Sequence, residues 1–217
     1  MVLRRTLAVL IMLVAAPALA QSAKKPEVLF WEWFAKKEAK LAEKAKTDPA
    51  GPMNEISDTL ERMVRQGLIA ELAVDPAPGK KSTVVISADG DKDLFDAVKA
   101  VVAAAPRLKH WDVLAFRQRR DAGDTIEFED ESFTVADFSF REVSRAEGKV
   151  DIEIFARGMK SKDDKSYMQA AFIFLDGIVG EYDVETKIGG IQLLPLPAKA
   201  PKGLRPLKDL AKVVDSL

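Results

Sequence analysis

Residues Lys165–Pro195, KSYMQAAFIFLDGIVGEYDVETKIGGIQLLP, combine a regular apolar pattern with an alternating acidic one. Alanine and larger apolar side chains recur there at three- and four-residue steps, which is the spacing of one buried helix face: Tyr167, Ala170, Ala171, Phe174, Leu175 and Ile178. Gly180 is the expected end of this helix, because a residue without a Cβ adopts the left-handed C-cap conformation at little cost. We therefore predict that a buried helix ending at Gly180 is the centre of the fold.

The segment after Gly180, Glu181–Thr186 (EYDVET), alternates acidic and uncharged residues, and this period of two predicts a strand. Its carboxylates would lie on one strand face, roughly 6.5 Å apart from one to the next. Paired carboxylates can cleave a glycosidic bond, so Glu181 and Asp183 are candidate catalytic residues. The alternative is a solvated strand face, which is where acidic side chains are ordinarily found.

Asp176 is the third candidate catalytic residue. It stands next to Gly177 inside the predicted helix, between apolar neighbours. A carboxylate in apolar surroundings needs a partner, and the basic residues available are Lys187, Arg117, Arg119 and Arg120. A structural ion pair is the alternative to catalysis, because such pairs also perturb carboxylates away from active sites.

The first twenty residues have the anatomy of a secretory signal peptide. A basic start at Arg4 and Arg5 is followed by the apolar run Leu7–Val14 and by Pro17–Ala20, which ends in an A-x-A pattern. This apolar run is much shorter than the about twenty residues that span a bilayer, so a permanent anchor is the less favoured reading. We predict cleavage after Ala20 and a periplasmic or secreted protein.

Composition excludes several classes of function. Cleavage after Ala20 would remove two of the 33 basic residues and none of the 34 acidic ones, leaving a net charge of −3. This balance disfavours a nucleic-acid partner, which needs a concentrated basic surface. The chain has no cysteine and one histidine, so disulfides, thiol catalysis and Cys- or multi-His metal sites are excluded. We expect no cofactor and no metal.

The order of predicted elements indicates the α+β class, with a mostly antiparallel or mixed sheet and helices packed on it. Strict strand–helix alternation is missing. The first half is expected to contain a helix from Pro26, a helix from about Asn54 to Gln66, a hairpin of 68–74 and 82–88, a helix over 91–105 and a strand over 111–117. A turn at 121–124 should lead into short strands near 125–129 and 132–135. A hairpin of 138–144 and 149–156 should follow, and a helix over 207–217 should close the chain. We expect one domain over 21–217, with 24–66 as an N-terminal helical subdomain.

The first predicted helix carries crowded aromatic side chains. Trp31 and Trp33 are candidate ligand-binding residues, since they could stack on a sugar or anchor the chain at a membrane surface beside the basic stripe Lys36, Lys40 and Lys44. Packing of the aromatic rings in the core is the alternative. The two tryptophans point in different directions on a helix, so one of them should stay partly exposed.

Two polar segments outside this helix, around Arg117 and over 89–93, are also candidate sites, and each has a structural explanation as the alternative. Arg117, with Arg119, could bind an anionic ligand, although pairing with nearby acids such as Asp121 and Asp124 is the simpler explanation. The acids of 89–93 (DGDKD) resemble part of a calcium loop but lack its glycine and its final glutamate. Capping of the following helix explains them better.

The chain resembles a bacterial family of uncharacterised proteins. The segments that carry the resemblance are FWEWFAKKEAKL (Phe30–Leu41), ISADG (Ile86–Gly90), APRLKHWDVLAFR (Ala105–Arg117) and FLDGIVGEYDVETKIG (Phe174–Gly189). Together they span most of the chain. The resemblance implies a whole α+β domain and brings no activity or catalytic residue with it.

The sequence therefore favours a non-enzymatic exported domain that binds an unidentified protein or envelope component. A hydrolase of a cell-envelope polymer, working through paired carboxylates, is the alternative. Contact with a membrane surface through Lys36, Lys40 and Lys44 is a third possibility.

Overall fold

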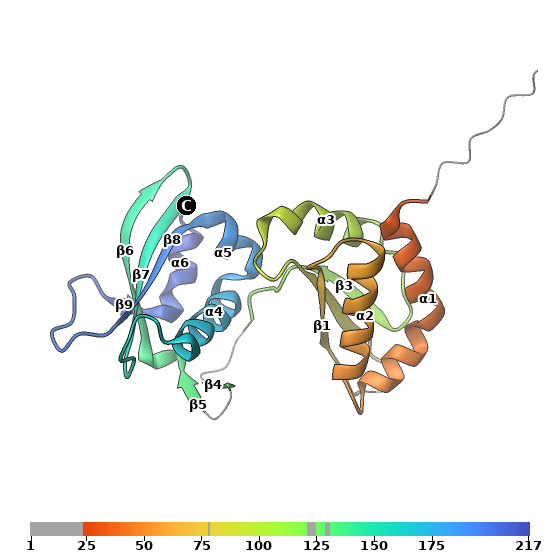
Figure 1. The fold of residues 1–217 in the computed structure, drawn as a ribbon, viewed down its shortest axis with the longest axis horizontal. Coiled ribbons are helices and arrows are strands. Elements are labelled where there is room, and N and C mark those ends of the chain that lie inside the picture. Colours follow the sequence, from red (N-terminus) through yellow and green to blue (C-terminus); the bar gives the residue numbers. More distant parts are fainter. Residues whose placement is uncertain (1–23, 78, 121–124, 129–130) are drawn as a thin grey trace, which may run out of the picture.

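The computed structural model describes residues 24–77, 79–120, 125–128 and 131–217. Over these residues the chain forms six α-helices and three sheets that are mostly antiparallel or mixed, which confirms the predicted α+β class. The predicted signal peptide (1–20) and the predicted turn at 121–124 lie outside the described residues. Figure 1 shows two lobes side by side, the N-terminal one built before residue 117 and the C-terminal one after residue 125.

The N-terminal lobe packs three helices against a three-stranded sheet of order β1-β2-β3. Strand β1 runs antiparallel to β2, and β2 runs parallel to β3. The predicted hairpin of 68–74 and 82–88 is thereby confirmed. The elements are α1 (Pro26–Ala45), α2 (Ala50–Met63), β1 (Ile69–Ala73), β2 (Ser82–Ser87), a 3₁₀ turn (Lys92–Leu94) leading into α3 (Phe95–Ala103), and β3 (Trp111–Ala115).

One face of this sheet is covered and the other is not. The side chains of Val84 and Ile86 are fully buried in the same cluster as Phe30 and Phe34 of α1, so the helices cover that face. The buried residues of α1 and α2 therefore share one core with the sheet. Strand alternation puts Thr83 and its neighbours on the opposite face, namely Ala73, Val85 and Leu114.

The C-terminal lobe is organised around a four-stranded sheet of order β8-β7-β6-β9. The predicted hairpin of 138–144 and 149–156 is confirmed as β6 and β7, which turn at Glu147 and Gly148. The elements are β4 (Thr125–Phe128), β5 (Glu131–Thr134), β6 (Phe138–Ala146), β7 (Lys149–Ala156), α4 (Lys165–Val179), α5 (Glu181–Lys187), β8 (Ile188–Pro195), β9 (Arg205–Pro206) and α6 (Leu210–Val214). Helix α4 buries Phe174 and Leu175 against this sheet, as the apolar spacing predicts.

The predicted strand over Glu181–Thr186 is wrong, because this segment is the short helix α5. Gly180 does end α4, with φ at +87° and ψ at 141°, and it turns the chain directly into α5. Helical spacing places Glu181 and Val184 on one buried face, and acids in the first turn suit the positive end of the helix dipole. The strand begins only at Ile188, as β8, which pairs parallel to β7.

The two lobes repeat one topology. In each, an antiparallel hairpin is followed by a helical crossover and then by a strand parallel to the second hairpin strand, giving the orders β1-β2-β3 and β6-β7-β8. The buried apolar side chains fall into two clusters, one in each lobe.

Candidate functional site

Glu181 joins the two lobes. Its side chain is 1% exposed, although it is a carboxylate. The carboxylate oxygens accept hydrogen bonds from the backbone N–H groups of Ala88 and Arg117, both at 2.9 Å, and from the hydroxyl of Ser87 at 2.8 Å. These donors stand at the carboxyl ends of β2 and β3. The predicted solvated strand face is therefore wrong for Glu181, because polar groups of the other lobe satisfy its carboxylate.

Arg117 is the centre of a charged cluster beside Glu181. Its guanidinium donates to Glu71, to Asp89 at 2.7 Å and to Asp176 at 3.1 Å. Burial by itself would lower the pKa of Arg117, but hydrogen bonds to Asp89 and Glu71 outweigh burial and hold that pKa above its ordinary value. The predicted pairing of Asp176 with one of the arginines is confirmed.

The carboxyl of Asp176 has an unusually high pKa for an aspartate. Burial raises the pKa of its carboxyl to about 6, and the nearby acids Glu181 and Glu71 add to the increase, whereas Arg117 opposes it. Asp176 therefore gains or loses its proton close to pH 6, although it is paired with an arginine.

Asp183, the remaining candidate catalytic residue, belongs to a different group of charges. Arg119 donates to Asp183 at 2.8 Å, to Asp215 at 2.6 Å and to the carbonyl oxygen of Val179 at 2.6 Å. Lys187 pairs with Asp183 as well, at 3.2 Å. Asp183 also lines a hollow of its own with Arg119 and Gly180, whereas Asp176 lines two other hollows. The three predicted catalytic carboxylates therefore do not converge in one cavity.

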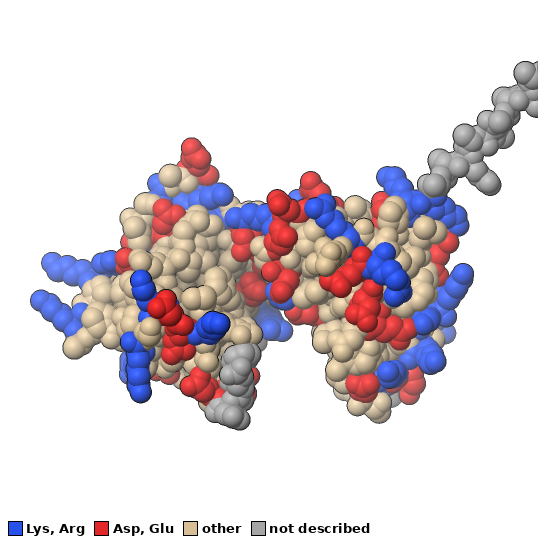
Figure 2. Space-filling view, in the orientation of Figure 1, with Lys and Arg blue, Asp and Glu red and all other residues tan. Residues whose placement is uncertain are grey.

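Two neighbouring hollows open where the lobes meet, and we call them together the interlobe cleft. One, of about 380 Å³, lies against α4, and the other, of about 210 Å³, extends over the uncovered face of the N-terminal sheet. They share a charged floor of Glu71, Arg117, Arg120 and Asp176. Figure 2 shows the notch between the lobes, with acidic side chains gathered where they join.

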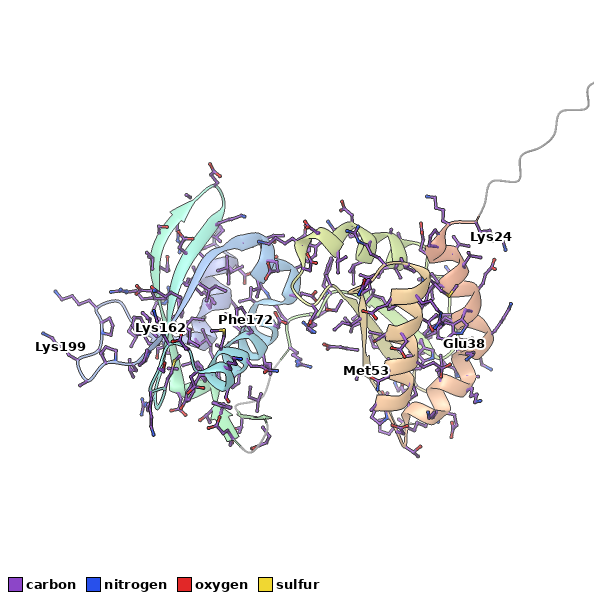
Figure 3. The ribbon with its side chains drawn as sticks, in the orientation of Figure 1. Lys24, Glu38, Met53, Lys162, Phe172 and Lys199 are labelled. Atoms are coloured by element: carbon purple, nitrogen blue, oxygen red, sulfur yellow. The ribbon has the colours of Figure 1, made fainter. Side chains whose placement is uncertain are left out.

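Apolar side chains line both walls of the interlobe cleft, beside polar ones such as Gln169 and Thr83. Phe172 and Ile173 of α4 form one wall, and Phe172 is 45% exposed. Figure 3 shows Phe172 on the side of α4 that faces the N-terminal lobe. Val85 and Leu114 belong to the opposite, sheet wall, and Leu114 is 41% exposed. The cleft thus combines exposed apolar side chains with a charged floor, which is typical of ligand sites.

The predicted ligand-binding tryptophans lie away from this cleft. Trp31 is 2% exposed, and its ring N–H donates to the carbonyl oxygen of Val101 at 2.7 Å, so Trp31 is part of the core. Trp33 is half-buried, and the ammonium group of Lys37 lies 5.3 Å from the centre of its ring. Arg117, in contrast, lines both hollows of the interlobe cleft, and Arg119, predicted with it, lines the smaller one.

The basic stripe of α1 faces solvent. Lys36 and Lys40 are exposed, and Lys44 pairs with Asp48 at 3.6 Å. Because Trp31 points into the core, the stripe has no fully exposed tryptophan beside it that could insert into a membrane surface. None of the described helices is both long and apolar enough to cross a bilayer.

One acid of the predicted capping string, Asp91, caps the following turn. Asp91 accepts from the backbone N–H of Asp93 at 2.9 Å at the start of the 3₁₀ turn, which confirms the capping interpretation. Within the part of the chain that the structure describes, no group of three or more His, Asp or Glu side chains is arranged to hold a metal ion.

Sequence reasoning missed Glu71 and assigned Asp89 to capping, whereas both residues complete the cluster around Arg117. Each is an ordinary acid in its local context: Glu71 stands in an apolar strand, and Asp89 stands in a turn with φ at +50°. The one available signal is Glu71, an acid at the centre of the apolar string IAELA, which places a carboxylate on the sheet face opposite the core.

Comparisons with protein-family models, with curated proteins and with solved structures gave no match. Function therefore has to be inferred from the geometry of the interlobe cleft and of the charges on its floor.

Proposed function

We propose that the chain is a non-enzymatic, exported binding or interaction domain, periplasmic or secreted, and that the interlobe cleft is its binding surface. The observation that carries this proposal is the uncovered face of the N-terminal sheet opposite α4. Leu114 and Phe172 stay 41% and 45% exposed on the two walls, although each lobe has a closed core of its own. Exposed apolar walls above a charged floor are typical of a binding site between two structural units.

The hydrogen-bond and ion-pair partners of Glu181 and Asp183 support binding over catalysis. Glu181 is saturated by donors of the N-terminal lobe, and Asp183 is held by two basic side chains. A carboxylate that serves as a general base or nucleophile has to reach its substrate. The leader-like residues 1–20 support export.

Site-directed photo-crosslinking tests the proposal, and the cysteine-free chain suits this method. A benzophenone maleimide attached to Leu114→Cys would place the reactive group in the cleft. The matched control is Val143→Cys on β6, whose side chain is 58% exposed and lies in the other lobe. We expect the probe at position 114, and not the probe at 143, to capture one defined envelope component, identified by mass spectrometry. Equal labelling from both positions, or none from either, would contradict the proposal.

Hydrolysis of a cell-envelope polymer is a second candidate, favoured by one observation. Asp176, with a pKa of about 6, shares the cleft floor with Glu71, and a carboxyl with a raised pKa is suited to donate a proton. If this reading holds, Asp176→Asn should reduce the release of fragments from labelled cell wall by about 100-fold or more. The control is Asp183→Asn, because Asp183 lies outside the cleft. Equal activity of Asp176→Asn and wild type would remove the hydrolase.

A further inference from the structure

We propose that the ligand of the interlobe cleft is a small zwitterion with an apolar side group: a free apolar amino acid or a short apolar peptide with free termini. This inference rests on the proposed function, because it names the chemical class that the cleft would bind. Three features of the cleft point to the same ligand: three carboxylates that share one guanidinium, a second arginine (Arg120) without a carboxylate partner among the described residues, and apolar side chains on both walls.

The three carboxylates around Arg117 favour an ammonium group. One guanidinium, that of Arg117, serves Glu71, Asp89 and Asp176 together. The side chain of Asp89 remains 65% exposed, so its carboxylate can accept a further hydrogen bond without any rearrangement of the cluster. A primary ammonium supplies three donors and a positive charge that Asp89 can bind.

Arg120 favours a carboxylate group on the same ligand. Its backbone N–H donates to the carbonyl oxygen of Gly177 at 2.9 Å, which ties Arg120 to the end of α4. Its side chain lines both hollows of the cleft, and none of the residues that the structure describes offers this guanidinium an ion pair or a hydrogen bond. A guanidinium binds a carboxylate in a bidentate geometry, which favours a ligand carboxylate at this position.

The walls and the volume define the remainder of the ligand. Val85 and Leu114 on one side, with Phe172 on the other, provide an apolar surface for a side chain of leucine size. The larger hollow, of about 380 Å³, has the volume of a small-molecule site, and the hollow of about 210 Å³ adjoins it. A folded protein partner would need a much larger surface, of about 800 Å² on each side.

Isothermal titration calorimetry with four probes separates these contributions. The probes are leucine, dileucine, N-acetyl-leucine (which lacks the ammonium) and leucine amide (which lacks the carboxylate). The variants are Arg120→Gln and Asp89→Asn, each with a matched control of the same chemistry outside the cleft. The controls are Arg65→Gln in the turn after α2 and Asp96→Asn on α3, whose side chains are exposed. Asn is a conservative choice at position 89, because Asn tolerates the positive φ of +50° found there.

The expected result is a specific pattern across ligands and variants. Leucine or dileucine should bind about tenfold tighter than either blocked form, since each lost charge removes one charge-assisted contact. Arg120→Gln should weaken the zwitterions about tenfold and leave leucine amide unchanged, whereas Asp89→Asn should weaken the zwitterions and leave N-acetyl-leucine unchanged. The tighter of leucine and dileucine identifies a free amino acid or a peptide as the ligand. Both control variants should bind as wild type does.

Three outcomes would overturn the inference: no binding of any probe, equal affinity for zwitterionic and blocked probes, or the same loss in Arg120→Gln and Arg65→Gln. These outcomes differ from failure of the proposed function. If the crosslinker at position 114 still captures a defined component while no zwitterion binds, the cleft is a binding surface for another chemistry. If both experiments are negative, the proposed function fails with the inference.

Discussion

The two lobes share one strand order and differ in what covers the ends of their parallel strands. The crossover between β2 and β3 contains the 3₁₀ turn and one helix, α3, whereas the crossover between β7 and β8 contains two helices, α4 and α5. The added helix α5 carries Glu181 into the N-terminal lobe, where its carboxylate binds at the ends of β2 and β3. Figure 1 shows α5 against the loop that leads into α3. One lobe thus provides the polar partner that the other lobe needs.

The ends of the parallel strands are thus covered differently in two lobes that have the same topology. The carboxyl ends of parallel strands present free backbone N–H groups, which bind anions or carboxylates in many α/β proteins. In the N-terminal lobe these groups are satisfied from within the chain, by Glu181. The nearby interlobe cleft keeps its apolar walls uncovered, so the contact between lobes closes one site and leaves another open.

The largest effect should come from a cavity in the C-terminal core. Phe174 is fully buried, so Phe174→Ala should reduce the free energy of unfolding by about 3–5 kcal/mol. All three tryptophans lie in the N-terminal lobe, so urea unfolding followed by tryptophan fluorescence reports on that lobe alone, and far-ultraviolet circular dichroism reports on both. If the contact couples the lobes, both signals should shift together. A shift in circular dichroism without one in fluorescence would show that the lobes unfold separately.

A slightly smaller effect should follow from removal of the carboxylate that joins the lobes. Glu181→Ala leaves the buried donors of Ala88, Arg117 and Ser87 without their acceptor and should cost about 3 kcal/mol. Beyond this loss, we expect the fluorescence and circular dichroism transitions to coincide in wild type and to separate in the variant. The control is Glu185→Ala on the same helix, which removes only a partly exposed pair with Lys92 and should cost less than about 1 kcal/mol. Equal losses in the two variants would contradict the assigned role of Glu181.

The protonation of Asp176 should make the stability of the contact depend on pH. Its folded-state pKa of about 6 lies above its ordinary value of 3.8, so the folded protein holds the proton more tightly than the unfolded chain does. This contribution is fully present below about pH 4 and is lost as the pH rises through 6. It amounts to at most about 3 kcal/mol, because one pKa unit corresponds to about 1.4 kcal/mol, and the partial exposure of Asp176 reduces it.

Asp176→Asn removes this group, while Arg117 keeps Glu71 and Asp89 as partners. Relative to wild type, the variant should therefore gain about 1–2 kcal/mol of stability between pH 4 and pH 7.5. Urea unfolding of both proteins at the two pH values measures the change. A difference between variant and wild type that stays constant with pH would show that Asp176 does not titrate in this range.

An effect of the same size should be found at the joint between α4 and α5. Gly180 has φ at +87°, and a Cβ added there would lie 3.4 Å from the carbonyl oxygen of Arg117. Gly180→Ala should cost about 1–2 kcal/mol through backbone strain. The control is Gly148→Ala in the β6–β7 turn, which has a similar φ of +72° and nothing within 4 Å of an added Cβ. A larger loss at 180 than at 148 would show that the backbone conformation and surroundings of Gly180, and not positive φ alone, set the cost.

Local patterns were sufficient for much of the fold. The helix from Pro26, both long hairpins and the buried face of α4 follow from apolar periodicity over neighbouring residues, and the structure confirms them. The segment Glu181–Thr186 could not be predicted in this way, because alternation over six residues fits a strand as well as a short helix. Its helical state depends on the buried Glu181, whose donors lie 64 to 94 residues earlier in the chain.

The candidate site was predictable only in part, for the same reason. Arg117 and Asp176 stand out locally, one in a run of basic residues and the other in an apolar helix. Glu71 and Asp89 contribute to the floor of the cleft only because β1 and the turn after β2 lie next to Arg117 in space. A single sequence contains no local mark of such a meeting between distant elements.

Glu181 follows Arg117 by 64 residues, which has a consequence for the order of synthesis. Because the ribosome makes the chain from its N-terminus, every element of the first lobe exists before the residue that satisfies its strand ends has been translated. Until Glu181 has been synthesised, the backbone N–H groups at the ends of β2 and β3 therefore lack their acceptor, and another carboxylate can bind them.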